Sequence, residues 1–203
     1  MDASARADGS HSRALSRYVV DTLRGHLPAL AVDRLDLAAD PPRHFGTLET
    51  AAIYTPDAEH TAAMRAAIAD SDALVARLLA VDALVVGTPI YNFGMPSTLK
   101  AFFDHVARNG RTFVADATGM RGLLGHLKVA VVVAAGGAYG PGEMFDGRDA
   151  LTPHVRAILG FLGVTDLAVL AARPTPFGGP AAAAAATAAA RAEAEALARR
   201  WAA

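Results

Sequence analysis

GTPIYNFGMPSTLKAFFD, residues 87–104, is the stretch that decides how this chain is organised. An apolar run at residues 81–86 precedes it and predicts a buried strand, and residues 96–108 predict a helix. Tyr91 and Asn92 therefore fall in the turn between a strand and a helix. In open α/β sheets, this is the kind of turn that binds ligands.

Outward from this turn, apolar runs alternate with helix-like segments along the chain. Residues 40–57 carry three prolines and a glycine and predict a long loop, and Ser71-Asp72 offers a second start within the helix expected at 61–80. The other helices are expected at residues 12–27, 150–162 and 181–201, and the other strands at residues 31–37, 128–135 and 164–171. This alternation predicts an α/β fold, a doubly wound parallel sheet with helices on both faces, in a single domain over residues 1–203.

The composition excludes several classes of function. The chain has no cysteine, which removes thiolate catalysis, disulfides and iron–sulfur clusters, and its seven histidines show no metal-binding spacing. Redox chemistry would therefore need a bound organic cofactor. The net charge of −1 favours neither nucleic acid nor a strongly acidic docking surface. No run approaches the roughly 18 apolar residues of a membrane span, and no leader peptide is visible, so we expect a soluble cytoplasmic protein.

The opening stretch DASARADGSHS, residues 2–12, places three serines and a glycine just before the first expected helix. Hydroxyls, loop amides and a helix N-terminus together suit a phosphate group. Taken alone, the stretch favours a disordered, serine-rich terminus that ends in a helix cap over a phosphate site. It contains neither the Gly-x-Gly-x-x-Gly of a dinucleotide site nor the Gly-Lys-Ser/Thr of a P-loop.

Three stretches taken in order resemble one known family: the serine stretch, PIYNFGMP at residues 89–96 and AAGG at residues 134–137. The family is that of the FMN-dependent NADH azoreductases, also described as NADH:quinone oxidoreductases, which are flavodoxin-like. The resemblance reaches residue 166 and includes LGFLGVTD at residues 159–166. It implies strand order 2-1-3-4-5, FMN as cofactor, and ping-pong transfer of two electrons from NADH to quinones and azo compounds. It also implies a homodimer, because in this family a second subunit completes the site.

The same resemblance implies which residues contact FMN. The phosphate would lie against Ser4, Ser10, His11 and Ser12; the ring against Pro89, Ile90, Tyr91, Asn92 and Phe93; and its pyrimidine end against Ala134, Ala135, Gly136 and Gly137. The two glycines would let a flat ring approach the backbone. Asn92 also suits a turn through its own backbone bonding, and Phe161 is either an aromatic wall beside the flavin or plain core. Because the flavin supplies the chemistry, no catalytic side chain is expected, and Asp104 is read as structural.

The chain departs from the family pattern at its start. Relatives open with an apolar strand before the serine stretch, whereas here Met1 is followed directly by Asp2. The first central strand is thus missing from this chain, which predicts a gap of roughly 10 Å in the sheet. We interpret the natural start as lying upstream, which the intact mass of the native protein tests.

A second departure concerns the substrate. In residues 112–116, TFVAD, small aliphatic residues follow Thr-Phe where relatives have Arg and Tyr, and Ala135 stands where an Arg is frequent. Fewer cations near the ring predict a preference for neutral quinones over sulfonated azo dyes.

Two other functions remain open on the sequence. One is a non-catalytic flavodoxin-type electron carrier or flavin-binding protein, although carriers usually present an acidic docking face and this chain is nearly neutral. The other is an NADPH-dependent FMN reductase on the same fold, which would release its flavin. The choice of NADH over NADPH does not follow from these motifs.

Overall fold

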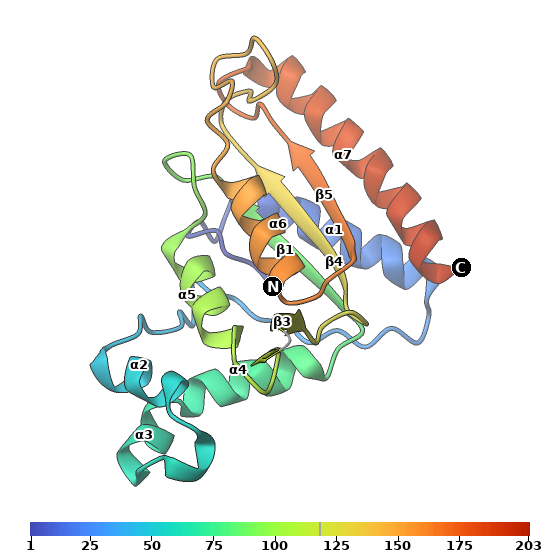
Figure 1. The fold of residues 1–203 in the computed structure, drawn as a ribbon. Coiled ribbons are helices and arrows are strands. Elements are labelled where there is room, and N and C mark those ends of the chain that lie inside the picture. The colour runs from blue at the N-terminus through green and yellow to red at the C-terminus, as the bar shows by residue number, and fades with distance from the viewer. Residues whose placement is uncertain (118) are drawn as a thin grey trace.

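The structure is a computed structural model that describes residues 1–117 and 119–203 (Figure 1). Its elements in chain order are α1 (His11–His26), α2 (Thr47–Tyr54), the 3₁₀ turn η1 (Asp57–Glu59), α3 (Ala62–Ala67), α4 (Ala69–Leu79), β1 (Ala83–Pro89), α5 (Ser97–Val106), β2 (Phe113–Asp116), β3 (Gly119–Gly122), β4 (Lys128–Ala134), α6 (Leu151–Phe161), β5 (Asp166–Ala172) and α7 (Gly179–Ala202). Among these described helices, none combines the length and the apolar character that crossing a membrane requires.

The central sheet has the order β1-β4-β5, and both pairings are parallel. Helices α1 and α7 cover one face, and α4, α5 and α6 cover the other (Figure 1). The expected α/β fold with a parallel sheet between two helical layers is therefore confirmed.

Strand β4 lies in the middle of this sheet because its residues are apolar on both faces. Val129, Val131 and Val133 pack toward the layer of α4, α5 and α6, while Ala130 and Val132 pack toward α1 and α7. Alternation of side chains along a strand sends successive residues to opposite faces, so a continuous Val/Ala run suits a strand covered on both sides.

The edge of the sheet beyond β1 is formed by single-residue bridges. Asp2 bridges to Gly87 of β1 on one side and to Asp36 on the other, both in parallel. The Ala3 amide donates to the Gly87 carbonyl at 2.8 Å, and the Leu37 amide donates to the Asp2 carbonyl at 2.9 Å. Residues 1–3 thus lie between β1 and residues 35–37 and form backbone hydrogen bonds with both.

Farther along the same edge, a cavity of about 690 Å³ lies beside β1. Its lining includes Met1, residues 29–35 and residues 81–85. Because Met1 and Ala3 hydrogen-bond to Val85 and Gly87, the expected gap does not extend along the whole of β1.

Two expectations for the first half of the chain are wrong. Residues 31–37 form no strand and contribute only the bridge at Asp36, because a single residue, Asp2, is available to pair with them. The loop expected at 40–57 contains α2, whose start is stabilised by a hydrogen bond from the Gly46 amide to the Glu49 carboxylate at 3.1 Å.

Other boundaries differ in detail. The segment at 61–80 forms two helices as suggested, but they meet at Ile68 rather than at Ser71-Asp72. Strand β1 ends at Pro89, three residues beyond the expected end at Val86, because its ladder with β4 continues through Pro89↔Ala134. The antiparallel hairpin of β2 and β3 was not expected from the sequence.

Candidate functional site

The turn that follows β1 is fixed to the end of β4. The Ile90 amide donates to the Ala134 carbonyl at 2.9 Å, and Tyr91 and Gly94 exchange two backbone hydrogen bonds at 2.9 and 3.0 Å. Both parallel strands end here, so the turn lies at the carboxyl edge of the sheet, the edge at which α/β folds bind ligands.

The middle of this turn has an unusual backbone. Asn92 and Phe93 adopt φ angles of 46° and 71°, in the left-handed region. Asn tolerates this region, but for a residue with a bulky side chain it costs on the order of 1–2 kcal/mol. The Phe93 carbonyl accepts from the Ala150 amide at 2.9 Å, and the Phe93 ring is 37% exposed. A strained turn that presents an aromatic ring to solvent is typical of a ligand site.

The serine stretch forms the approach to α1. Ser10 is the N-cap of α1 and accepts from the Arg13 amide, and its hydroxyl lies 3.3 Å from that of Ser12. Ser4, Ser10 and Ser12 are buried, whereas His11 is exposed beside α7. The first turn of α1 holds no acidic residue, so the positive end of the helix dipole is available to an anion.

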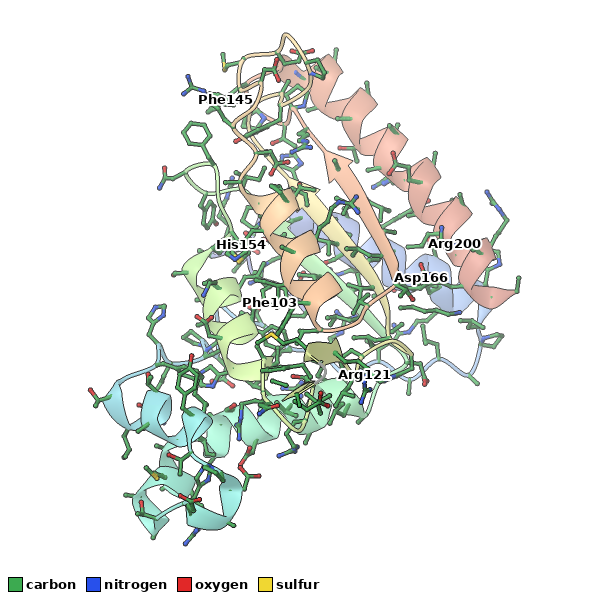
Figure 2. All side chains as sticks on the ribbon, in the orientation of Figure 1. Phe103, Arg121, Phe145, His154, Asp166 and Arg200 are labelled. Atoms are coloured by element: carbon green, nitrogen blue, oxygen red, sulfur yellow. The ribbon has the colours of Figure 1, made fainter. Side chains whose placement is uncertain are left out.

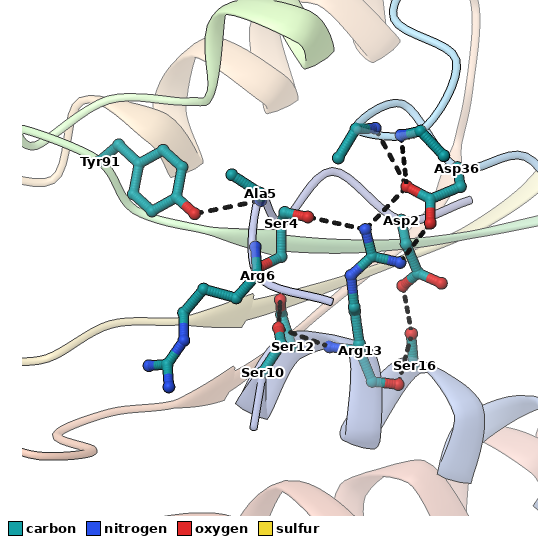
Figure 3. A network of polar contacts seen from close by, with 12 residues as sticks. Asp2, Ser4, Ala5, Arg6, Ser10, Ser12, Arg13, Ser16, Asp36 and Tyr91 are labelled. Carbon is teal, nitrogen blue, oxygen red and sulfur yellow. Dashed lines mark hydrogen bonds and ion pairs between the residues drawn. The ribbon is translucent and has the colours of Figure 1, made fainter. Parts of the chain in front are cut away.

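The serine stretch and the Tyr91 turn are brought together directly. The Ala5 amide donates to the Tyr91 hydroxyl at 3.2 Å (Figure 3). The predicted phosphate and ring segments therefore meet at one edge of the sheet, although they are separated by about 80 residues of sequence.

The glycine loop after β4 contacts the chain's own phenyl rings. A Cβ on Gly136 would lie 3.1 Å from the Phe177 ring, and one on Gly137 would lie 2.4 Å from the Phe145 ring. Figure 2 shows Phe145 in this loop, at the other end of the sheet from Asp166 and Arg200. In this structure, the rings of Phe145 and Phe177 therefore occupy the space beside the glycines.

The other end of the loop is held by the segment after β5. The Thr175 amide and hydroxyl both donate to the Ala135 carbonyl at 2.9 Å, and the Phe177 amide donates to the Gly136 carbonyl at 3.0 Å. Ala134 and Ala135 are buried.

Phe161 is not near the other predicted site residues of its own chain. It ends α6, whose start is bonded to Phe93, so it lies about 15 Å along the helix from the turn. Its ring packs against Phe113 at 4.8 Å between centroids and is 39% exposed. If Phe161 forms a wall of a flavin site, that site belongs to another copy of the chain.

Sequence reasoning missed a polar cluster beside the glycine loop. The Arg173 guanidinium donates to the Asp149 carboxylate at 2.6 Å and stands 5.2 Å over the Tyr139 ring. Burial raises the pKa of Asp149, but hydrogen bonds from Arg173 and Thr152 outweigh it, and the net pKa is lowered. Burial also raises the pKa of Tyr139. No sequence motif predicts this cluster, because its residues come from three separate segments of the sequence.

The parallel sheet between helical layers and the loops gathered at its carboxyl edge define a flavodoxin-like protein, and three comparisons agree. A family model described as flavodoxin-like fold matches residues 1–198. An FMN-dependent NADH:quinone oxidoreductase of Xanthobacter autotrophicus is 44% identical over 170 residues, covering 83% of this chain and 82% of the relative. One from Nostoc sp. is 38% identical over 179 residues, covering 88% and 86%.

Among solved structures, the azoreductase AzrA matches with a TM-score of 0.88 at 25% identity, covering 98% of this chain and 97% of that one. The chain belongs to the flavodoxin-like family of FMN-dependent NADH:quinone oxidoreductases and is therefore an oxidoreductase. The resemblance inferred from the serine stretch, the PIYNFGMP turn and the double glycine is confirmed.

Proposed function

We propose that this chain binds FMN and uses it to pass two electrons from NADH to quinones and azo compounds in a ping-pong cycle. The observation that carries the proposal is the hydrogen bond from the Ala5 amide to the Tyr91 hydroxyl. This bond places the N-terminus of α1, which suits an anion, beside the exposed aromatic residues of the Tyr91 turn. The relatives of this chain are named as FMN-dependent NADH:quinone oxidoreductases.

The composition of the serine stretch supports a site for the phosphate of FMN. Ser4, Ser10 and Ser12 offer hydroxyls, and the N-terminus of α1 offers amides and a positive dipole end with no nearby acidic residue in its first turn. His11 lies exposed at the same helix start.

The ring would be held by Ile90, Tyr91, Asn92 and Phe93, with the loop at 134–137 at its pyrimidine end. Tyr91 and Phe93 are 39% and 37% exposed, so the turn presents aromatic surface for stacking. Because Phe145 and Phe177 already cover the glycines, we expect these two rings to set how far the flavin reaches over the loop.

FMN supplies the redox chemistry, accepting and returning two electrons with a proton. The part of this chain is to orient the cofactor, to stack substrate against it and to exclude water. Asp104 pairs with Lys100 at 2.5 Å, and the buried His105 bonds the Arg43 carbonyl at 2.8 Å. The contact with Lys100 supports the structural role expected for Asp104, and neither side chain is assigned as an acid or base of the reaction.

The assembly proposed is a cytoplasmic homodimer of single-domain subunits. The distance along α6 between Phe161 and the chain's own Tyr91 turn supports it, because the exposed Phe161 ring is free to face a neighbouring copy's site. Sedimentation of the FMN-loaded protein tests the dimer. A monomer that turns over normally would contradict it.

The test of function is an anaerobic two-stage reaction of the FMN-reconstituted protein. We expect flavin absorbance, its bleaching by NADH, and its return on addition of menadione without NADH present. An electron carrier would not be bleached by NADH without a partner reductase, and an FMN reductase would lose its flavin on gel filtration after reduction. Protein that stays colourless after incubation with FMN would refute the proposal.

Substrate choice is the finer part of the proposal. The small side chains at 112–116 and Ala135 support a preference for menadione over a sulfonated azo dye. Arg148 stands 5.7 Å over the Phe93 ring, so one cation does lie beside the turn. Equal turnover of the dye, lost in Arg148→Met, would show that this arginine replaces the cations of the relatives.

A further inference from the structure

Arg13, in the first turn of α1, links three segments through one guanidinium group (Figure 3). Its Nη1 and Nη2 atoms donate to the two carboxylate oxygens of Asp36 at 2.6 and 2.7 Å. Nη2 also donates to the Ser4 carbonyl at 2.7 Å. The Arg13 side chain is 15% exposed and the Asp36 side chain is 41% exposed, so the ion pair is only partly shielded from solvent.

Asp36, on the far side of this contact, is itself held firmly. Its carboxylate accepts from the Ala38 and Ala39 amides at 3.0 and 3.3 Å, and its backbone bridges to Asp2. Hydrogen bonds from Arg13 lower the pKa of Asp36 to about 2. The carboxylate is therefore charged at every pH at which the protein would work.

The Ser4 carbonyl is the point at which this arrangement reaches the candidate site. Ser4 begins the loop that ends at Ser10, and the next residue, Ala5, donates to Tyr91. A fixed Ser4 carbonyl thus sets the course of the loop between the sheet edge and the N-terminus of α1.

We propose that Arg13 is a positioning residue for the phosphate of FMN, acting through the Ser4 carbonyl while Asp36 holds its guanidinium in place. The inference rests on the proposed FMN site. Arg13 acts through the loop because it donates to the Ser4 carbonyl, while Asp36 accepts from two more of its five N–H groups. The Arg13 Nε is buried and has no hydrogen-bond partner among the described residues, so direct binding of the phosphate is the alternative that the Asp36 variant tests.

The two roles predict opposite results for Asp36→Asn. If Arg13 positions the loop, weakening its anchor disorders the Ser4 carbonyl and FMN affinity falls. If Arg13 is a phosphate ligand restrained by Asp36, removing the carboxylate charge releases the guanidinium and FMN affinity rises.

A second arginine provides a matched control. Arg77 of α4 donates to both oxygens of Asp33 at 2.9 and 2.8 Å and to the Arg34 carbonyl at 2.9 Å. It thus makes the same chemical contacts, a carboxylate pair and one backbone carbonyl, on the same segment that carries Asp36. It makes no recorded contact with the serine stretch within the described parts of the chain.

The experiment is a titration of apoprotein with FMN and with riboflavin, which lacks the phosphate, followed by flavin fluorescence. We expect wild type to prefer FMN. Arg13→Met should lower FMN affinity about tenfold, as loss of one charge-assisted hydrogen bond predicts, and leave riboflavin affinity within about twofold. Arg13→Lys should recover part of the loss, Asp36→Asn should fall in the same direction as Arg13→Met, and Arg77→Met should keep the wild-type ratio.

The results distinguish the role of Arg13 from the existence of the FMN phosphate site. If the wild-type protein binds FMN no more tightly than riboflavin, the proposed phosphate site is contradicted. Wild type that prefers FMN, with an unchanged ratio in Arg13→Met and Arg13→Lys, would overturn the role of Arg13 alone, as would tighter FMN binding by Asp36→Asn. Circular dichroism of each variant checks folding, and Arg13→Lys serves where Arg13→Met does not fold.

Discussion

The two edges of β1 are unlike. On its β4 side, the strand is paired along seven positions, from Ala83↔Lys128 to Pro89↔Ala134. On its other side, the recorded backbone bonds join it to Met1 and Ala3 at Val85 and Gly87. One edge is a continuous ladder, and the other is a short contact at the end nearest the serine stretch.

Burial follows the same division. Residues 129–134 of β4 are buried throughout, whereas residues 83–85 of β1 are half-buried and line the cavity of about 690 Å³. This edge of β1 is thus hydrogen-bonded beside the candidate site and bordered by the cavity at the opposite end. The few backbone contacts around Asp2 therefore lie beside the candidate site, and the β1-β4-β5 ladder makes up the rest of the sheet.

The largest effect is expected from Gly87→Ala, which inserts a methyl group into the short contact between β1 and Asp2. A Cβ there would lie 2.5 Å from Asp2 Oδ1 and 2.8 Å from Ser16 Oγ, so the bridge must shift. We expect the free energy of unfolding to fall by about 3 kcal/mol in urea denaturation. Gly25→Ala is the control, because nothing lies within 4 Å of its Cβ, and it should gain about 0.5 kcal/mol. Equal stability of the two variants would show that the edge tolerates displacement.

The two edges can also be compared by the same substitution on each. Val132→Ala, in the buried middle strand, should cost about 2 kcal/mol, because it leaves a void among α1, α7 and the sheet. Val85→Ala, beside the cavity, should cost less than about 1 kcal/mol, since its side chain is already partly unpacked. Thermal unfolding of both variants measures the difference. A larger cost at Val85 would mean that the cavity side is as well packed as the ladder.

A third test adds residues to the edge of β1 that faces Met1 and the cavity, called here the open edge. Val-Ile-Val-Leu joined to the Met1 amino group would run along Ala83 and Val85, beside which the cavity lies. After the entropy of ordering it, the extension should raise the free energy of unfolding by about 1–2 kcal/mol. A Gly-Ser extension of the same length is the control and should give no gain. Trp201, the chain's single tryptophan, also lines the cavity, so its emission reports whether the segment enters.

The ladder was predictable from sequence, and the short contact was not. The Val/Ala run at 128–135 is apolar throughout, which is typical of a strand covered on both faces, and the site loops follow directly from where such strands end. The expected strand at 31–37 failed because its pairing depends on a single partner residue, Asp2. The residue pattern of one segment does not show how many residues of a neighbouring segment are available to pair with it.

The predicted site residues divide in the same way. The serine stretch and the Tyr91 turn were placed from motifs, and the structure brings them together. Arg13 and Asp36 were missed because they are 23 residues apart and meet only through tertiary structure. Phe145 and Phe177 were missed for the same reason, since nothing near them in sequence indicates that they cover the glycines.

A smaller effect is expected from acid. The pKa of Asp36 is about 2 in the folded protein, below the usual 3.8, so its stabilising contribution is present above pH 4 and is lost as the pH falls from about 4 to 2. Because this side chain is 41% exposed, solvent screening reduces the contribution to about 1 kcal/mol. Denaturation between pH 5 and pH 2 should show a shallower slope in Asp36→Asn than in wild type. Identical slopes would mean that the ion pair with Arg13 adds nothing to stability.

The smallest effect belongs to the Met1 amino group at the open edge. It donates to the Val85 carbonyl at 2.8 Å, and burial lowers its pKa below the usual 8.0. The unfolded chain then binds more protons than the folded one in the interval below pH 8, so stability should rise with pH until about 8 and level off. Acetylation of this amino group removes the titration and should flatten that part of the curve, while the change below pH 4 from Asp36 persists. A rise that survives acetylation would assign the titration to another group and leave the open edge without a buried charge.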